Sequence, residues 1–369
     1  MRVVPSTRVP RATVPGAAVL GAMMLGALVV TLSAQDKPTG QGFSFRSNTD
    51  LINVTVTVTD ENGRFVSGLN REDFVVYEDG KPQAVQQFDS DRVPVSLGIA
   101  LDTSGSMAGE KIQAAQAALN RFLFDLLGKQ DQVFLYRFDS RPELIQGWTP
   151  DRAAVSRALG TLSPRGGTAM YDTVSEAIPL AQKGSERKKA LVVISDGEDT
   201  SSRVSLRDAQ QLIRESEVLV YAIAIDPSVT SSRVMPGART PTASTPPPAS
   251  KPVPSPFPGR KAAPATPPPA STPTPASAWT SNRAGSSASS SAGINALRLL
   301  TDDSGGRTEV IQSHRDLDPA TAGIADELSR QYFLGYVSAA PKDGRWHTID
   351  VQVRKGNYHV RARKGYVAG

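Results

Sequence analysis

The chain has 369 residues, a hydrophobic content of 39% and a formal net charge of +5, and it contains no cysteine. This length suits one large domain or two modest ones. The lack of cysteine excludes disulfides, thiolate zinc sites and cysteine nucleophiles. The basic residues form no cluster with interleaved aromatic residues, which argues against nucleic-acid binding. The short basic run Arg187-Lys188-Lys189 is expected to be a solvated loop.

The first 34 residues have the features of an export signal. Three arginines precede an apolar stretch at residues 14–32, and the small residues around Ala34 suit cleavage. Because the stretch is also long enough to span a bilayer, residues 1–34 are expected to be a signal peptide or a retained membrane anchor. In both cases the body of the protein is expected to be exported: periplasmic, secreted or anchored to the membrane. Residues 35–49 are polar and are expected to form a flexible lead.

Both ends of the remaining chain predict β structure. Apolar and polar residues alternate over residues 51–59, and residues 74–77 and 84–88 flank a turn, so residues 50–92 are expected to form an N-terminal β unit with a hairpin. Strands at residues 346–354 and 358–363 predict a second hairpin within residues 338–369. Since an isolated hairpin is barely stable in water, we expect these two segments to join in one small β-sandwich-like unit.

Residues 93–337 alternate between buried-type strands and helices. Val- and Ile-rich strands separated by helices predict an α/β fold, with a mainly parallel sheet covered by helices on both faces. The strands are expected at residues 95–102, 133–138, 144–148, 190–194, 218–225, 308–311 and 332–337. The helices are expected at residues 109–127, 151–159, 170–182, 206–216, 294–300 and 320–330.

A segment rich in Pro, Ser, Thr and Ala interrupts this unit at residues 227–292. Such a composition cannot bury enough apolar surface to offset the entropy of ordering it, so it is expected to be disordered, with polyproline II character. Because the α/β pattern resumes after it, the segment is interpreted as an insert within one domain. It leaves a strand at its carboxyl end, so it is expected to start on the edge of the sheet where ligands bind.

Three polar clusters fall at the expected carboxyl edge of the sheet, where open parallel sheets bind ligands. Asp102, Ser104 and Ser106 follow the first strand, Thr168 lies in a Gly-Gly loop, and Asp196 ends a later strand. Hydroxyls and carboxylates without His or Cys suit a hard cation, Mg²⁺ first, with Mn²⁺ or Ca²⁺ as alternatives. Two hydroxyls and one carboxylate would bind directly, and the second carboxylate through water. A carboxylate from a partner protein could fill the open position.

In this order, these five residues resemble the metal-ion-dependent adhesion site of the von Willebrand factor type A domain. The α/β pattern over residues 93–337 is also similar to that family, apart from the insert. The flanking strands and residues 360–366 are similar to a group of exported proteins of this type common in acidobacteria. The resemblance implies a Rossmann-like fold and metal-dependent, adhesion-type protein binding through an acidic residue of the partner, rather than catalysis.

Some of these residues also allow other interpretations. Ser104 or Ser106 could cap the following helix, because both side chains can accept bonds from free N–H groups. Asp102-Thr103-Ser104-Gly105 matches an aspartic-protease loop, but that chemistry needs a second such loop, and none occurs. A dinucleotide site would need Gly-x-Gly-x-x-Gly after the first strand. No catalytic residue is therefore expected. The remaining alternative is an envelope-anchored scaffold with a purely structural metal, in which the insert or the β unit makes the contacts.

Overall fold

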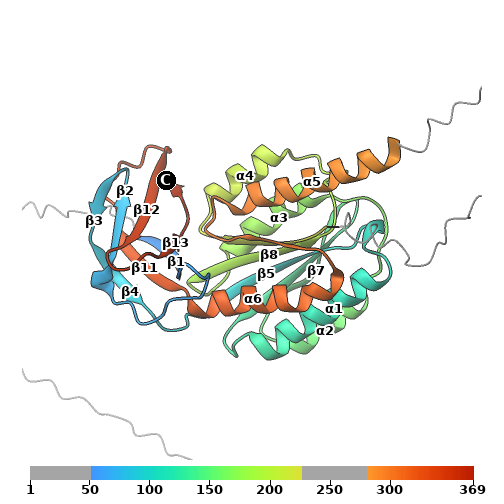
Figure 1. The fold of residues 1–369 in the computed structure, drawn as a ribbon, viewed down its shortest axis with the longest axis horizontal. Coiled ribbons are helices and arrows are strands. Elements are labelled where there is room, and N and C mark those ends of the chain that lie inside the picture. Colours follow the sequence, from blue (N-terminus) through green and yellow to red (C-terminus); the bar gives the residue numbers. More distant parts are fainter. Residues whose placement is uncertain (1–50, 227–280) are drawn as a thin grey trace, which may run out of the picture. The chain divides into compact units, whose positions relative to one another are not determined.

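The computed structural model describes residues 51–226 and 281–369, and for residues 281–290 it describes the backbone alone. Within these ranges the chain forms an α/β unit and a β unit, built from the elements labelled in Figure 1. The expected export signal, the flexible lead and residues 227–280 of the insert lie outside the described residues. In the described part of the chain, no helix combines the length and the apolar character needed to cross a membrane.

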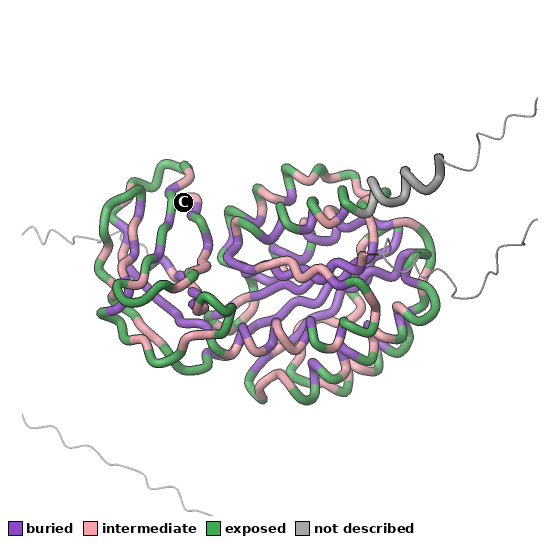
Figure 2. The backbone as a smooth tube through the Cα atoms, in the orientation of Figure 1, coloured by how far each residue is buried: buried purple, intermediate pink, exposed green. Residues whose placement is uncertain are grey.

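The α/β unit is organised around a six-stranded sheet of order β10-β9-β8-β5-β6-β7. Its strands are β5 (Val95–Asp102), β6 (Gln132–Phe138), β7 (Pro142–Thr149), β8 (Lys188–Ser195), β9 (Leu219–Ile225) and β10 (Thr308–Ile311). All neighbours pair in parallel except β7, which is antiparallel to β6. Every residue of β5 and β9 is buried, as expected for strands that are covered on both faces. Figure 2 shows this burial along the centre of the sheet.

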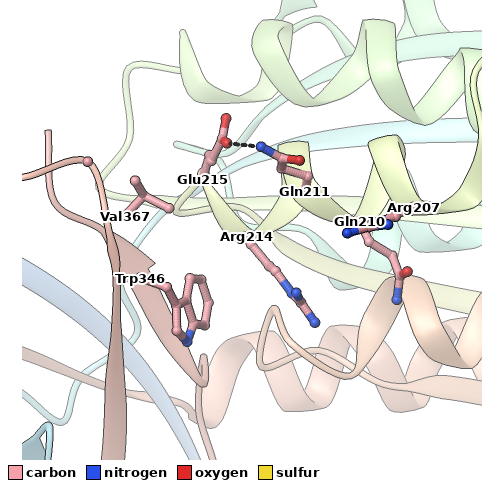
Figure 3. Close-up of a pocket in the computed structure, with 8 residues that line it drawn as sticks. Arg207, Gln210, Gln211, Arg214, Glu215, Trp346 and Val367 are labelled. Carbon is pink, nitrogen blue, oxygen red and sulfur yellow. Dashed lines mark hydrogen bonds between the residues drawn. The ribbon is translucent and has the colours of Figure 1, made fainter.

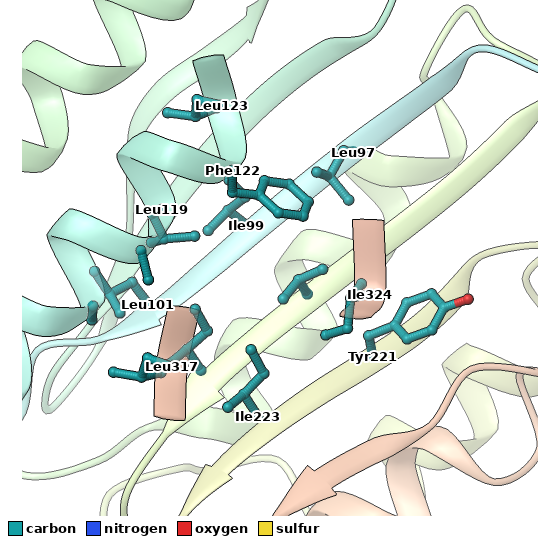
Figure 4. Packing of buried hydrophobic residues seen from close by; sticks show 14 of the residues in the cluster. Leu97, Ile99, Leu101, Leu119, Phe122, Leu123, Tyr221, Ile223, Leu317 and Ile324 are labelled. Atoms are coloured by element: carbon teal, nitrogen blue, oxygen red, sulfur yellow. The ribbon is translucent and has the colours of Figure 1, made fainter. Parts of the chain in front are cut away.

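Helices cover both faces of this sheet because alternate residues of each strand point to opposite sides. Leu97, Ile99 and Leu101 of β5 lie in one hydrophobic cluster with residues of α1 (Glu110–Arg121), α2 (Arg152–Gly160), α6 (Leu317–Arg330) and the π-helical turn η3 (Phe122–Leu126). Figure 4 shows the part of this cluster formed by β5, α1, η3 and α6. Ala100 faces the other cluster, which includes α3 (Met170–Gln182), α4 (Leu206–Arg214) and α5 (Ser281–Thr301). Burying each large aliphatic side chain contributes roughly 1.5–3 kcal/mol. The predicted α/β architecture is confirmed.

The β unit consists of two four-stranded antiparallel sheets, of order β13-β1-β11-β4 and β14-β12-β2-β3. The strands are β1 (Leu51–Thr59), β2 (Phe74–Glu78), β3 (Lys81–Gln83), β4 (Val85–Asp89), β11 (Tyr332–Val337), β12 (Trp346–Val353), β13 (His359–Arg361) and β14 (Gly365–Val367). Val54, Val56 and Val58 lie in one core with Val76 and Val351 of the other sheet. The predicted sandwich-like unit from the two ends of the chain is therefore confirmed.

The first expected hairpin forms at the expected turn but with a different second strand, whereas the second expected hairpin does not form. Strand β2 pairs with the short β3, whereas β4 crosses to the other sheet and pairs with β11. Strand β12 pairs with β2 and β14, whereas β13 pairs with β1. Consecutive strands of a sandwich alternate in the same way whether they pair with each other or belong to opposite sheets. The alternation therefore predicts the strands but not their partners.

The strand at residues 332–337 was expected in the α/β unit but lies between β1 and β4 of the β unit. Tyr332, Leu334 and Tyr336 face the sandwich core. The opposite face of the strand is covered too, since the Arg187 guanidinium lies 4.8 Å from the ring centroid of the buried Phe333. A strand covered on both faces is apolar throughout, which is why its sequence is typical of a parallel sheet.

Two further expectations need correction. The insert was expected to be disordered up to residue 292, but α5 begins at Ser281, so residues 281–292 are helical. The small residues of this stretch carry no apolar periodicity that would predict a helix. The basic run Arg187-Lys188-Lys189 is not a solvated loop, because Lys188 is buried at the start of β8 and its Nζ donates to the carbonyl of Leu328 at 2.7 Å.

Candidate metal centre

Asp102 is the last residue of β5, and its side chain is buried and held in place at both oxygens. The backbone N–H of Ser104 donates to Oδ1 at 2.8 Å, and the hydroxyl of Ser195 donates to Oδ2 at 2.6 Å. Burial raises the pKa of Asp102 to about 6, against the lowering effect of these hydrogen bonds, and the charge of Asp196 adds to the rise. Two hydrogen bonds therefore hold the Asp102 carboxylate in one orientation, and burial makes its negative charge unfavourable.

The two serines of the motif lie side by side beyond the strand. The Oγ atoms of Ser104 and Ser106 are 3.0 Å apart. The short 3₁₀ turn η2 (Gly105–Met107) carries Ser106, and the N–H of Gly105 donates to the carbonyl of Gly166 at 3.0 Å. This bond attaches the serine loop to the Gly-Gly loop that precedes Thr168.

Neither serine caps the helix that follows. The N-cap of α1 is Gly109, with φ of 79°, and no side chain bonds to the free N–H groups there. Ser104 precedes η2 but makes no side-chain cap bond. The interpretation of these serines as helix caps is therefore wrong, and their hydroxyls face the carboxylate cluster instead.

Thr168 is buried, and its backbone is attached to the loop that follows Asp196. Its N–H donates to Oγ1 of Thr200 at 3.0 Å, and its carbonyl accepts from the N–H groups of Thr200 and Ser201. A Cβ built at Gly197 would lie 3.9 Å from Thr168 Oγ1 and 4.0 Å from Ser106 Oγ. Gly197 is thus a neighbour of both hydroxyls, which places Thr168 at the same cluster as Ser106.

Asp196 follows β8 and is buried. Its Oδ1 accepts from the hydroxyl of Ser106 at 2.7 Å. Its Oδ2 forms an ion pair with Nζ of Lys111, which also donates to the carbonyl of Ser106 at 3.0 Å. Asp196 therefore holds Ser106 in position and has a cationic partner of its own.

All five candidate residues thus lie at the carboxyl edge of the sheet. Asp102, Ser104, Thr168 and Asp196 are buried, whereas Ser106 is exposed and opens the cluster to solvent. Across residues 51–226 and 281–369 no group of three or more His, Cys, Asp or Glu side chains is arranged to hold a metal. The oxygen donors here are mainly hydroxyls, a set that suits a hard cation such as Mg²⁺.

The burial of Asp102 provides the test of whether a cation fits. Within the described ranges, no basic side chain forms an ion pair with Asp102. A buried carboxylate is costly unless a positive charge compensates it. A divalent cation held by Asp102 and the adjacent hydroxyls would supply that charge, so the residues present fit such an ion.

Three residues of this site did not emerge from the sequence. Ser195 orients Asp102, Lys111 pairs with Asp196, and Gly197 lies beside two hydroxyls. Ser195 directly precedes Asp196 at the end of β8, so its position in the sequence could have indicated that it belongs to the site. Asp199, in the loop that follows Asp196, accepts from the N–H of Tyr171 at 3.0 Å and from the hydroxyl of Ser202 at 2.6 Å.

A pocket of about 300 Å³ lies elsewhere, where α4 meets β12 and β14 (Figure 3). The Arg214 guanidinium lies 5.8 Å from the ring centroid of Trp346, and Arg214 Nε also pairs with Asp303 at 2.6 Å. Gln211 donates to Glu215 at 2.9 Å. None of the five candidate residues lines this pocket.

The α/β unit thus carries a cluster of hydroxyl and carboxylate oxygens at the carboxyl edge of its mainly parallel sheet. Residues 97–198 match the family model of the von Willebrand factor type A domain. This matched segment lies in the α/β unit and contains all five candidate residues.

Curated relatives share only part of their length with this chain. An uncharacterized protein of Synechocystis sp. is 32% identical over 111 residues, which cover 29% of this chain and 26% of that protein. Inter-alpha-trypsin inhibitor heavy chain H4 of Homo sapiens is 26% identical over 136 residues, which cover 34% of this chain and 14% of that protein. The chain thus spans about a quarter of the first relative and less of the second.

Solved structures show a similar but distant likeness. A von Willebrand factor type A protein from Catenulispora acidiphila has a TM-score of 0.43 at 12% identity, covering 88% of this chain and 74% of that one. Proximal thread matrix protein 1 from the mussel byssus, with a zinc-occupied MIDAS motif, has a TM-score of 0.34 at 19% identity and covers 38% of each chain.

Proposed function

We propose that the von Willebrand factor type A domain of this chain binds a divalent cation, Mg²⁺ first, and through it an acidic residue of a partner protein. Domains of this family are in general interaction modules that hold a divalent metal, which supports the coarser part of the proposal. The observation that carries it is the buried Asp102, which lacks a cationic partner beside the paired hydroxyls of Ser104 and Ser106.

Each residue of the cluster has a distinct role in this proposal. Asp102, Ser104, Ser106 and Thr168 supply oxygen ligands, and Ser195 keeps the Asp102 carboxylate in its orientation. Asp196 holds the Ser106 hydroxyl and contributes through water. A bound cation would supply the positive charge that attracts the carboxylate of a partner. Ser106 is the exposed member, so the partner approaches from its side.

The proposed setting is outside the cytoplasm, since residues 1–34 have the composition of an export signal or anchor. The candidate partners are therefore envelope or extracellular proteins. We propose binding rather than catalysis, because domains of this family are in general interaction modules.

The test is retention of partner proteins from an envelope extract by the immobilised chain, once with Mg²⁺ and once with EDTA. We expect proteins that are retained only with Mg²⁺ and that are lost with Asp102→Asn, a variant of the same shape without the charge. Equal retention in EDTA, or by the variant, would contradict the proposal. That outcome would favour a scaffold that makes its contacts through the insert or the β unit.

A further inference from the structure

Lys111 places a positive charge of the protein directly against the candidate metal centre. It lies in the first turn of α1, and its Nζ contacts Oδ2 of Asp196 and the carbonyl of Ser106. The side chain of Lys111 is 25% exposed, whereas that of Asp196 is 1% exposed. The ammonium group therefore reaches inward from the rim to a buried carboxylate.

We propose that Lys111 is a built-in counter-cation, which stabilises the metal-free centre and competes with the divalent cation for it. This inference rests on the proposed metal site and concerns how that site is regulated. It assigns Lys111 a role in setting the metal affinity rather than a role as a ligand.

Charge compensation explains why the metal-free centre needs this lysine. Asp102 and Asp196 are both buried. The Ser106 hydroxyl contacts Asp196 at 2.7 Å and the Ser104 hydroxyl at 3.0 Å, and the backbone N–H of Ser104 donates to Asp102 at 2.8 Å. Two like charges in such a cluster destabilise each other, and burial reduces their screening by solvent. Lys111 compensates one of the two, so the metal-free protein carries a single uncompensated buried carboxylate here.

The same contact opposes a metal ion. A divalent cation at the hydroxyls would lie beside the ammonium group, because Ser106 contacts both Ser104 and Lys111. A bound cation must then either displace Lys111 or remain close to its ammonium group and be repelled by it. Both effects lower the measured affinity for the metal. Displacement is feasible, since Lys111 already reaches solvent and the exposed Ser106 can exchange its lysine contact for water.

The experiment compares the full chain with Lys111→Met, which keeps most of the apolar stem and removes the charge. Lys129→Met is the matched control: it removes the same charge from an exposed residue that precedes β6, at the opposite edge of the sheet. The readouts are the Mg²⁺ dissociation constant by calorimetry and the melting temperature in EDTA and in Mg²⁺.

For Lys111→Met we expect Mg²⁺ binding that is tighter by about fivefold or more, the lower range of the factors seen for coupled sites. We also expect a lower melting temperature in EDTA and a larger stabilisation by Mg²⁺, with neither effect in Lys129→Met. Unchanged or weaker Mg²⁺ binding by Lys111→Met would overturn the inference. If neither the native chain nor the variant binds Mg²⁺, the proposed function fails as well. If only Lys111→Met binds Mg²⁺, Lys111 competes strongly enough to exclude the ion from the native chain, and the inference is supported.

Discussion

Ser106 donates its hydroxyl hydrogen to Oδ1 of Asp196 across 2.7 Å, although the two residues are 90 positions apart in the chain. The contact exists because β5 and β8 are parallel neighbours and end at the same edge of the sheet. The centre is therefore assembled by the tertiary fold, and shifts in the loops that carry it should change metal affinity.

Gly293 of α5 packs directly against the loop that follows Asp196. A Cβ at Gly293 would lie 2.9 Å from the carbonyl oxygen of Gly197 and 3.0 Å from the nitrogen of Glu198. Gly293→Ala must therefore displace this backbone, and we expect it to cost about 1–3 kcal/mol of stability and to weaken Mg²⁺ binding. Gly160→Ala is the control, because its Cβ would meet nothing within 4 Å. Urea unfolding and Mg²⁺ titration of both variants provide the check, and equal behaviour of the two would refute the packing argument.

The stability of the chain should rise with alkaline pH because of Lys188. Burial, helped by the nearby charge of Arg92, lowers the pKa of Lys188 to about 8 from its ordinary 10.5. Between these values the unfolded chain binds more protons than the folded chain at this residue, so the free energy of unfolding increases with pH across that window. The effect amounts to about 3 kcal/mol for a shift of this size.

Lys188→Met should remove this pH dependence, so from pH 7.5 to pH 10 the free energy of unfolding should rise less in the variant than in the native chain. Urea titrations at the two pH values measure it. Lys189→Met, at the less buried neighbouring position, should leave the pH dependence intact. A pH dependence in Lys188→Met equal to that of the native chain would count against the assignment.

Glu327 joins the α/β unit to the β unit through a buried polar network. Its side chain is 1% exposed. In the α/β unit it accepts from Arg307 Nε at 2.8 Å and from the Tyr221 hydroxyl at 2.9 Å. In the β unit it accepts from the Thr57 hydroxyl of β1 at 3.2 Å and forms an ion pair with Arg361 of β13. Glu327→Ala removes the acceptor of the buried Tyr221 and Thr57 hydroxyls. It also removes the carboxylate that the part-buried Arg307 and Arg361 share. We expect the loss to be about 1–3 kcal/mol, the typical cost of leaving a buried donor unsatisfied.

The control for this change is Glu309→Ala, which removes a more exposed partner of the same Arg307. Exposed pairs contribute only about 0–1 kcal/mol, so this variant should unfold almost like the native chain. Unfolding monitored by intrinsic fluorescence gives both values. Equal losses in the two variants would show that the network does not hold the units together.

The strands, the helices and the five candidate residues could be predicted because each depends on local pattern. Strand β1 and helix α3 have the predicted bounds, since alternation and apolar periodicity are strong there. The candidate residues follow from a general property of parallel sheets, whose strand ends meet at one edge.

The incorrect predictions concern contacts between residues that are far apart in the sequence, which a local pattern does not determine. The alternation of β4 and β13 is compatible with either sheet of the sandwich, and only the packing of the two sheets decides between them. Lys111 is an ordinary polar residue in the first turn of a helix, and nothing in its sequence neighbourhood indicates that it reaches Asp196. Lys188 looks like part of a solvated basic run because its acceptor, the carbonyl of Leu328, is 140 residues away.

The most direct test of the metal centre is a calorimetric titration of Mg²⁺ into the EDTA-treated, desalted full chain, beside the variants Asp102→Asn and Glu198→Gln. Both variants remove one negative charge, but Glu198 is exposed and lies outside the hydroxyl cluster. We predict one saturable site per chain that Asp102→Asn abolishes and Glu198→Gln nearly preserves. No saturable binding by the native chain, or equal binding by Asp102→Asn, would contradict the account.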